Sequence, residues 1–260
     1  MRLAGTLLIG AIAGALAGPA LAGPWTPAKG KGQVILKFED IRANQGYGPD
    51  GVPADLPAER RDTVIALFAE YGLTDRLTVQ VKGDWQSGED AFVDYEGRGP
   101  VEIGLTWQVW HDDRAAVSLY GGYADGGEGR NAGYAAPGVG EQDWEVRASV
   151  GRSFGGLDSR WSPSGSFIDL QVARRMRDGL PDETRIDATA GAHLGDDWMV
   201  LAQAFAGAGD GEDGPRWLSL EASVVRDFGD WSFQAGWRQA VAGRETPRSG
   251  GPVISLWRRF

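Results

Sequence analysis

The segment Arg76–Gln86, RLTVQVKGDWQ, alternates between apolar and polar side chains along its whole length. Its apolar positions are Leu77, Val79, Val81 and Trp85, and its polar positions include Thr78, Gln80, Lys82 and Asp84. Successive residues of a β-strand point to opposite faces of a sheet. The segment therefore predicts a strand with one apolar face and one polar face.

The same alternation recurs in about twelve segments, with ten as the alternative count. They cover residues 32–41, 61–73, 76–86, 99–110, 115–125, 142–154, 165–176, 183–194, 197–207, 216–228, 230–241 and 251–260. Only the segment 197–207 is ambiguous in phase, because Met199, Leu201 and Phe205 share a face with Gln203. We therefore expect an all-β chain with many turns.

The predicted connections alternate in length along the chain. The tight turns are Gly72–Arg76, His111–Arg114, Gly195–Asp197 and Gly229–Asp230, whereas Arg42–Arg60, Ser87–Gly99 and Gly126–Gln142 are expected to be long loops. Short turns at one end and long loops at the other are typical of outer-membrane barrels. The connection Gly155–Pro163 departs from the rule, since it should be short and is longer.

Alternation alone fits either a soluble β-sandwich or a membrane barrel. Three features favour the barrel. The segments run about 9–12 residues, the length that a tilted strand needs to cross a bilayer. The polar face carries charges of both signs, which suit a wet lumen. Aromatic residues near strand ends share the apolar face, as in interfacial girdles; they are Tyr71, Trp85, Trp107, Trp144, Phe154, Trp198, Phe228, Trp231 and Phe260.

The N-terminal stretch Met1–Ala22 has one positive charge, an apolar run and an Ala-Leu-Ala ending. These features predict a cleaved secretory signal peptide. Residues 23–260 would then form a single barrel domain. The chain has no cysteine, so neither a disulfide nor a thiolate site is available. A net charge of −10 argues against nucleic acid as a partner.

Taken with the C-terminal Phe260, these features resemble a Gram-negative bacterial outer-membrane β-barrel. The resemblance is to the small, about 12-stranded porin-like or transporter-like barrels, including a group associated with aromatic-compound uptake. It implies an antiparallel up-and-down barrel in the outer membrane, with short periplasmic turns and contacts to outer-membrane lipid and lipopolysaccharide. It also implies that the barrel assembly machinery reads Phe260. Ile254 and Leu256 fit this signal, whereas Arg258 departs from it.

About twelve strands should enclose a narrow lumen shaped by its side chains. We therefore expect a channel or facilitated transporter for small solutes, with the long loops Arg42–Arg60 and Gly126–Gln142 as inward gates. The candidate lumen-lining residues are Lys82, Asp84, Glu102, Arg147, Arg185, Asp187 and Glu221. The alternatives are a structural or interaction barrel with a plugged lumen, a membrane lipid-modifying enzyme and a soluble secreted sandwich.

An enzyme is disfavoured by the histidines. A barrel phospholipase needs a serine and a histidine together near the outer leaflet, whereas His111 and His193 are expected near the periplasmic end. We predict neither a cofactor nor a metal. The basic stretches around Arg175 and Arg258 are expected to pair with lumen acids or to lie at the membrane interface. Within the last strand, Trp257 is expected on the lumen side, opposite Phe260.

Overall fold

The computed structural model describes residues 23–91, 94–126, 140–155 and 165–260, and these residues form one antiparallel sheet of thirteen strands. The strands are β1 (Gly32–Tyr47), β2 (Pro53–Gly72), β3 (Leu77–Glu89), β4 (Asp94–His111), β5 (Ala115–Asp125), β6 (Gln142–Gly155), β7 (Gly165–Arg177), β8 (Glu183–Leu194), β9 (Trp198–Gly209), β10 (Arg216–Phe228), β11 (Trp231–Arg244), β12 (Thr246–Pro247) and β13 (Gly250–Arg259). No helix in these ranges is long and apolar enough to cross a membrane. The predicted signal peptide lies outside the described residues.

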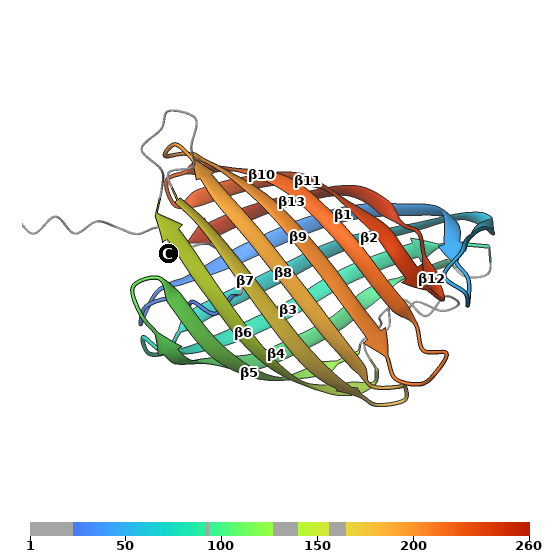
Figure 1. The fold of residues 1–260 in the computed structure, drawn as a ribbon, viewed down its shortest axis with the longest axis horizontal. Helices are drawn as coiled ribbons and strands as arrows, with labels where there is room; N and C mark the ends of the chain where they lie inside the picture. The colour runs from blue at the N-terminus through green and yellow to red at the C-terminus, as the bar shows by residue number, and fades with distance from the viewer. Residues whose placement is uncertain (1–22, 92–93, 127–139, 156–164) are drawn as a thin grey trace, which may run out of the picture.

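The sheet closes on itself because β1 pairs with β2 on one side and with β13 on the other. Each remaining strand pairs with its neighbour in sequence, except that β13 follows β11. The two-residue β12 only extends the sheet at the end of β1. Twelve tilted strands therefore form an up-and-down barrel, which confirms the predicted fold class (Figure 1). Closure leaves no unpaired sheet edge to face lipid.

Two expected loops are largely strand. Arg42–Arg60 was expected as a loop, but β1 continues to Tyr47 and β2 begins at Pro53, which leaves only a short turn. Likewise, β3 and β4 extend into Ser87–Gly99. The alternation fades in both stretches because the hairpins continue their backbone pairing where no apolar outer face is required. Arg42–Arg60 is thus barrel wall rather than an inward gate, and most of the proposed gate Gly126–Gln142 lies outside the described residues.

The outer face of the barrel is apolar. Large side chains such as Ile103, Val146 and Leu170 point outward and are about half exposed. All nine residues of the predicted aromatic girdles are also exposed on this face, which confirms the assigned phase of their strands. Such an apolar outer face is unfavourable in water but suits the hydrocarbon core of a bilayer. In membrane barrels, outward apolar side chains alternate with inward polar ones along each strand.

The last strand shows how the barrel closes. Backbone hydrogen bonds join Phe260 and Gly32 in both directions at 3.0 Å. The Phe260 ring stacks on Tyr71 of β2 at a centroid distance of 6.5 Å. Trp257 points inward and is 1% exposed, whereas Phe260 is 50% exposed. The predicted phase of the closing strand is therefore confirmed.

Short turns gather at the end of the barrel where Phe260 lies. In the β4–β5 turn the Asp112 carboxylate accepts backbone hydrogen bonds from Arg114 at 2.8 Å and Ala115 at 2.7 Å. These bonds favour the charged carboxylate and lower the pKa of Asp112 below its usual value. Glycines with positive φ, Gly195 at 71° and Gly229 at 66°, complete two further turns. We call this end of the barrel the short-turn end and the opposite one the long-loop end.

Candidate lumen site

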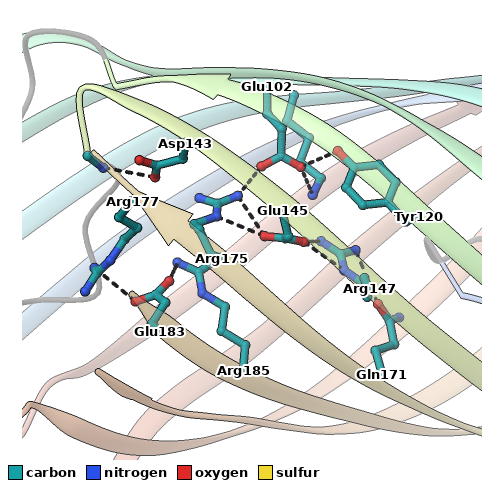
Figure 2. Close-up of polar contacts among 12 residues, drawn as sticks. Glu102, Tyr120, Asp143, Glu145, Arg147, Gln171, Arg175, Arg177, Glu183 and Arg185 are labelled. Carbon is teal, nitrogen blue, oxygen red and sulfur yellow. Dashed lines mark hydrogen bonds and ion pairs between the residues drawn. The ribbon is translucent and has the colours of Figure 1, made fainter. Parts of the chain in front are cut away.

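The inner wall formed by β3 to β7 carries a cluster of paired charges, the β3–β7 cluster, shown in Figure 2. Its members are Lys82, Glu102, Tyr120, Glu145, Arg147 and Arg175. Arg175 lies at its centre, since its guanidinium forms ion pairs with both Glu102 and Glu145. Arg147 pairs with the other oxygen of Glu145. Each carboxylate therefore has a cation, as burial of charge requires.

Glu102 receives two further bonds from neighbouring strands. Lys82 Nζ of β3 lies 3.0 Å from Glu102 Oε1, and the Tyr120 hydroxyl of β5 donates to the same oxygen at 2.6 Å. The Tyr120 ring fits between Gly104 and Gly122, where an added Cβ would lie within 2.3 Å and 2.1 Å of its hydroxyl oxygen. The two glycines therefore make room for the ring, and the ring fixes the hydroxyl on Glu102.

The wall continues toward the long-loop end with a second set of pairs. Arg177 Nη1 lies 3.0 Å from Glu183 Oε2, and Arg185 pairs with the other oxygen of Glu183 (Figure 2). Glu183 is fully buried between these two guanidinium groups. Asp143 instead accepts a backbone hydrogen bond from Gly140 at 3.0 Å. Side chains of the wall thus hold one another in place.

A second group, the β1–β11 cluster, lies on the strands that close the barrel. Arg238 Nη1 of β11 lies 3.1 Å from Glu39 Oε1 of β1, and its Nη2 lies 2.7 Å from Glu221 Oε2 of β10. Lys37 Nζ also pairs with Glu39, at 2.6 Å. Asp187 of β8 lies within electrostatic range of Arg147 from the first cluster and of Arg238 from the second. Its charge is therefore felt by both clusters.

Several inward carboxylates lack such compensation, among them Asp84, Asp169 and Glu70. The partners of Glu70 are the amides of Gln33 and Gln80. The structure gives neither Asp84 nor Asp169 an ion pair with a described residue. Asp169 accepts a hydrogen bond from Gln171 at 3.1 Å, and it is influenced electrostatically by Asp187, which has the same sign. Asp84 is likewise influenced by Glu39. The lumen therefore has a surplus of negative charge at Asp84 and Asp169.

The lumen is apolar at the short-turn end. Five inward side chains pack together there, Phe167 of β7, Met199 and Leu201 of β9, Val225 of β10 and Trp257 of β13. We call them the floor. The floor settles the ambiguous strand, because Met199 and Leu201 point inward while Trp198 and Val200 are exposed outside. An apolar floor excludes water from this part of the lumen.

The segment Gly23–Lys31 crosses the same end before β1 begins. Trp25 packs on Phe167 in an edge-to-face arrangement with ring centroids 6.2 Å apart. The Pro24 carbonyl accepts a hydrogen bond from Gln108 Nε2 at 3.0 Å. At the other end of the segment, the Lys29 amide donates to Asp75 Oδ1 at 3.0 Å. The segment is thus fastened to β4, β7 and the β2–β3 turn, and it adds to the floor.

Close packing fixes the place of this segment. A Cβ on Gly151 of β6 would lie 2.4 Å from the Trp25 ring and 2.7 Å from Pro24. Any larger residue at position 151 would therefore displace the segment. Gly151 is one residue in a regular strand, with no turn or positive φ to require glycine. Its role is to let the segment approach the wall.

The structure places all seven candidate lumen residues on inward positions of their strands. Lys82, Glu102 and Arg147 belong to the β3–β7 cluster, and Glu221 to the β1–β11 cluster. Arg175, Tyr120, Glu145 and Arg238 were not among the seven candidates, although Glu145 and Arg238 fall on the predicted inward face and Arg175 pairs with lumen acids as expected. Their strand phase gave the signal for an inward position, but partners from four different strands cannot be read from one strand's pattern.

The two histidines lie near the short-turn end, as predicted. His111 is the last residue of β4, and His193 lies one residue before the end of β8. The described part of the chain contains no group of three or more histidine, aspartate or glutamate side chains arranged to hold a metal. The charge clusters pair carboxylates with guanidinium groups instead.

Solved structures of outer-membrane channels have the same fold. The COG4313 outer membrane channel from Pseudomonas putida F1 aligns over 92% of this chain and 99% of its own, with a TM-score of 0.67 and 12% identity. The NanC porin aligns with a TM-score of 0.55 and 7% identity, over 86% of this chain and all of its own. The KdgM porin, solved with disordered oligogalacturonate, aligns with a TM-score of 0.51 and 6% identity, over 88% of this chain and 99% of its own.

This chain has the twelve-stranded antiparallel fold of outer-membrane barrels. No protein-family model matches its sequence, and no curated protein matches it either. The likeness rests on structure, since the identities are low. Fold alone does not define a substrate, so function has to be argued from the lumen.

Proposed function

We propose that the protein is an outer-membrane channel or facilitated transporter that passes small solutes through a narrow polar lumen. The observation that carries this proposal is the set of inward charges formed by the β3–β7 cluster, Asp187 and the β1–β11 cluster. Charges on a lumen wall are favourable where water and polar solutes reach them. The structural likeness to channels and porins supports the same class.

The lumen charges favour cations and neutral polar solutes over anions. Most guanidinium groups are already neutralised by carboxylates, whereas Asp84 and Asp169 add negative charge without an ion pair to a described residue. A low-dielectric wall strengthens the field of such groups within the lumen. We therefore expect anions to meet an electrostatic barrier.

Passage also depends on the floor. Trp25 and the floor residues occupy the short-turn end, which corresponds to the periplasmic end in our proposed orientation. A solute that enters from the long-loop end meets the charged clusters first and the apolar floor last. The floor sets low conductance in the resting protein, and displacement of Gly23–Lys31 would raise it.

The remaining cellular features are proposals of the same kind. Export by the Met1–Ala22 signal peptide would bring the chain to the outer membrane, where the apolar outer face contacts lipid and lipopolysaccharide. The barrel assembly machinery would read the C-terminal strand through Phe260, whose outward ring supports this role. We propose no enzymatic activity, since both histidines lie far along their strands toward the short-turn end.

Planar-bilayer recording tests the channel proposal. Purified protein should give discrete low-conductance events, and a salt gradient should give a reversal potential of the sign expected for cation preference. The double variant Asp84→Asn, Asp169→Asn should weaken that preference, while Asp112→Asn in an external turn serves as the control. Anion preference in the wild type would overturn the selectivity argument.

A plugged structural barrel is the second candidate, and the inserted Gly23–Lys31 segment is the observation that favours it. Such a barrel would not conduct with its segment in place, and it would remain closed to solutes after the segment is loosened. Swelling of liposomes in small sugars, measured for the wild type and for Trp25→Ala, separates the two functions.

A further inference from the structure

An arginine interrupts the outer aromatic girdle at the short-turn end. Arg226 of β10 points outward, and its guanidinium carbon lies 5.0 Å from the ring centroid of Trp198 and 5.0 Å from that of Phe228. Both rings are exposed on the outer face. The cation is thus held between two aromatic faces at the boundary of the apolar surface.

The guanidinium of Arg226 contacts two aromatic rings and has no ion pair with an acidic residue in the described part of the chain. Its side chain has no hydrogen bond or ion pair with a described residue, whereas Arg175 inside the lumen pairs with two glutamates. Stacking on rings orients a guanidinium but leaves its N–H donors unused. Those donors therefore remain available to an acceptor from outside the protein.

A second arginine lies two strands away. Register pairs Phe228 of β10 with Trp231 of β11, and Trp231 with Arg258 of β13. The Arg258 guanidinium carbon lies 5.3 Å from the Trp231 ring centroid, and Arg258 Nη1 also pairs with Asp230 at 2.9 Å. Arg226 and Arg258 thus flank one aromatic patch, with Arg258 partly neutralised.

We propose that this patch, Trp198, Arg226, Phe228, Trp231 and Arg258, is a binding site for the phosphate of an anionic phospholipid in the adjacent leaflet. The inference rests on the proposed insertion of the barrel in a bilayer. Tryptophan and arginine side chains at this level meet the headgroups, while the apolar residues above them meet acyl chains. Arg226 supplies a planar pair of donors that matches phosphate oxygens.

The surrounding charges restrict where the phosphate can lie. The turn carboxylates Asp196, Asp197 and Asp230 are exposed beyond the girdle, on its aqueous side. They repel a phosphate that approaches from solution, so a free anion is disfavoured. A lipid phosphate arrives from the bilayer side, where the aromatic faces and Arg226 lie. The occupant is therefore a lipid headgroup rather than dissolved phosphate.

Lipid retention measured by native mass spectrometry tests the site. The full-length mature protein is reconstituted in vesicles of phosphatidylcholine and phosphatidylglycerol, extracted with mild detergent, and the retained lipids are counted. We expect the wild type to enrich phosphatidylglycerol, and Arg226→Gln to lower that enrichment about fivefold. Equal enrichment in the two proteins, or no preference of the wild type for phosphatidylglycerol, would overturn the proposal.

The matched control is Arg152→Gln. Arg152 is also an outward arginine at the short-turn end, but it lies 5.7 Å from a single ring, that of Phe154, and within electrostatic reach of Asp112. We expect this variant to keep its phosphatidylglycerol, and an equal loss in both variants would refute a specific site.

If Arg226→Gln does not fold, lipid enrichment by the wild type measured at increasing salt concentration tests the same proposal. Phosphatidylglycerol enrichment should fall as sodium chloride rises, because salt screens exposed charges, and enrichment independent of salt would contradict the proposal. Lipid retention does not require conduction. A barrel that never conducts but retains phosphatidylglycerol would therefore refute the channel function and keep this site.

Discussion

The β3–β7 cluster and the floor lie in the same lumen but are built on opposite principles. The cluster buries charges that are stabilised only by one another, with Arg175 between Glu102 and Glu145. The floor buries apolar side chains such as Leu201 and Trp257, each of which contributes independently of any single partner. Removing one cation from the cluster therefore costs at least as much as truncating the largest floor residue, because it leaves uncompensated charge.

The difference also teaches how such a barrel divides its tasks. In the proposed channel, the cluster would keep the lumen polar and select what can enter, whereas the floor and Trp25 would close the short-turn end. Both depend on inward positions of the same strands: β7 provides Arg175 for the cluster and Phe167 for the floor. A change in one region should therefore leave the other intact, and this independence can be tested.

The largest expected effect is the loss of the central cation. Arg175→Ala should lower the free energy of unfolding by about 3–5 kcal/mol, because two buried glutamates lose their shared partner. The neighbouring Arg174→Ala is the matched control, since Arg174 points outward and pairs with Asp182 and Asp210 at an exposed rim. That change should cost about 0–1 kcal/mol.

Urea unfolding in detergent micelles, followed by tryptophan fluorescence, measures both variants. Equal losses for Arg175→Ala and Arg174→Ala would show that the cluster contributes no more than a surface ion pair, and the contrast with the floor would fail.

The next prediction compares two substitutions in the closing strand, one expected to lower stability and the other to lower assembly. Trp257→Ser should lower the unfolding free energy by about 3–5 kcal/mol, because it opens a cavity in the floor. Phe260→Ser should change the stability of the assembled barrel less, since Phe260 is on the outer face. It should instead reduce the amount of barrel that reaches the outer membrane.

Gel mobility with and without boiling, applied to membrane fractions, measures the assembled amount of each variant. A Trp257→Ser yield below that of Phe260→Ser would contradict the assembly role of the terminal aromatic.

A smaller effect concerns the room made for Tyr120. Gly122→Ala would place a Cβ 2.1 Å from the Tyr120 hydroxyl oxygen, so the ring must leave Glu102. Overpacking of this kind costs about 1–3 kcal/mol. Gly121→Ala is the control, because an added Cβ there meets nothing within 4 Å. It should be neutral or stabilising by up to about 1 kcal/mol.

The same urea titration compares the two glycine variants. Similar stabilities would show that the Tyr120–Glu102 hydrogen bond is dispensable to the cluster.

Most of the fold could be predicted because lipid outside and water inside impose alternation. β5, for example, was expected at 115–125 and spans Ala115–Asp125. Strand phase and strand length were harder to predict wherever the outer face does not meet lipid or the inner face does not meet water. β9 was ambiguous because its inner face meets the apolar floor, so Met199 and Leu201 oppose outward residues that are apolar too. The predicted spans of β1 and β2 end before the observed strands do, because the tips of this hairpin need no apolar outer face and so show no alternation.

The sequence predicted which site residues point into the lumen, but it did not predict which residues pair with one another. The inward positions of Lys82 and Glu102 follow from the alternation of their own strands, and they lie opposite each other across β3 and β4. Arg175, by contrast, reaches Glu102 across two intervening strands, which depends on the curvature of the closed wall. The Gly23–Lys31 segment has no alternation, so its place within the lumen had no sequence signal.

Single-channel recording of the wild type beside Trp25→Ala tests the central claim most directly. A narrow polar lumen limited by its floor predicts small, cation-preferring events in the wild type and larger events in Trp25→Ala. Trp110→Ala, which alters an outward tryptophan near the same end, should behave as the wild type. Recordings in which neither the wild type nor Trp25→Ala ever conducts would contradict the account.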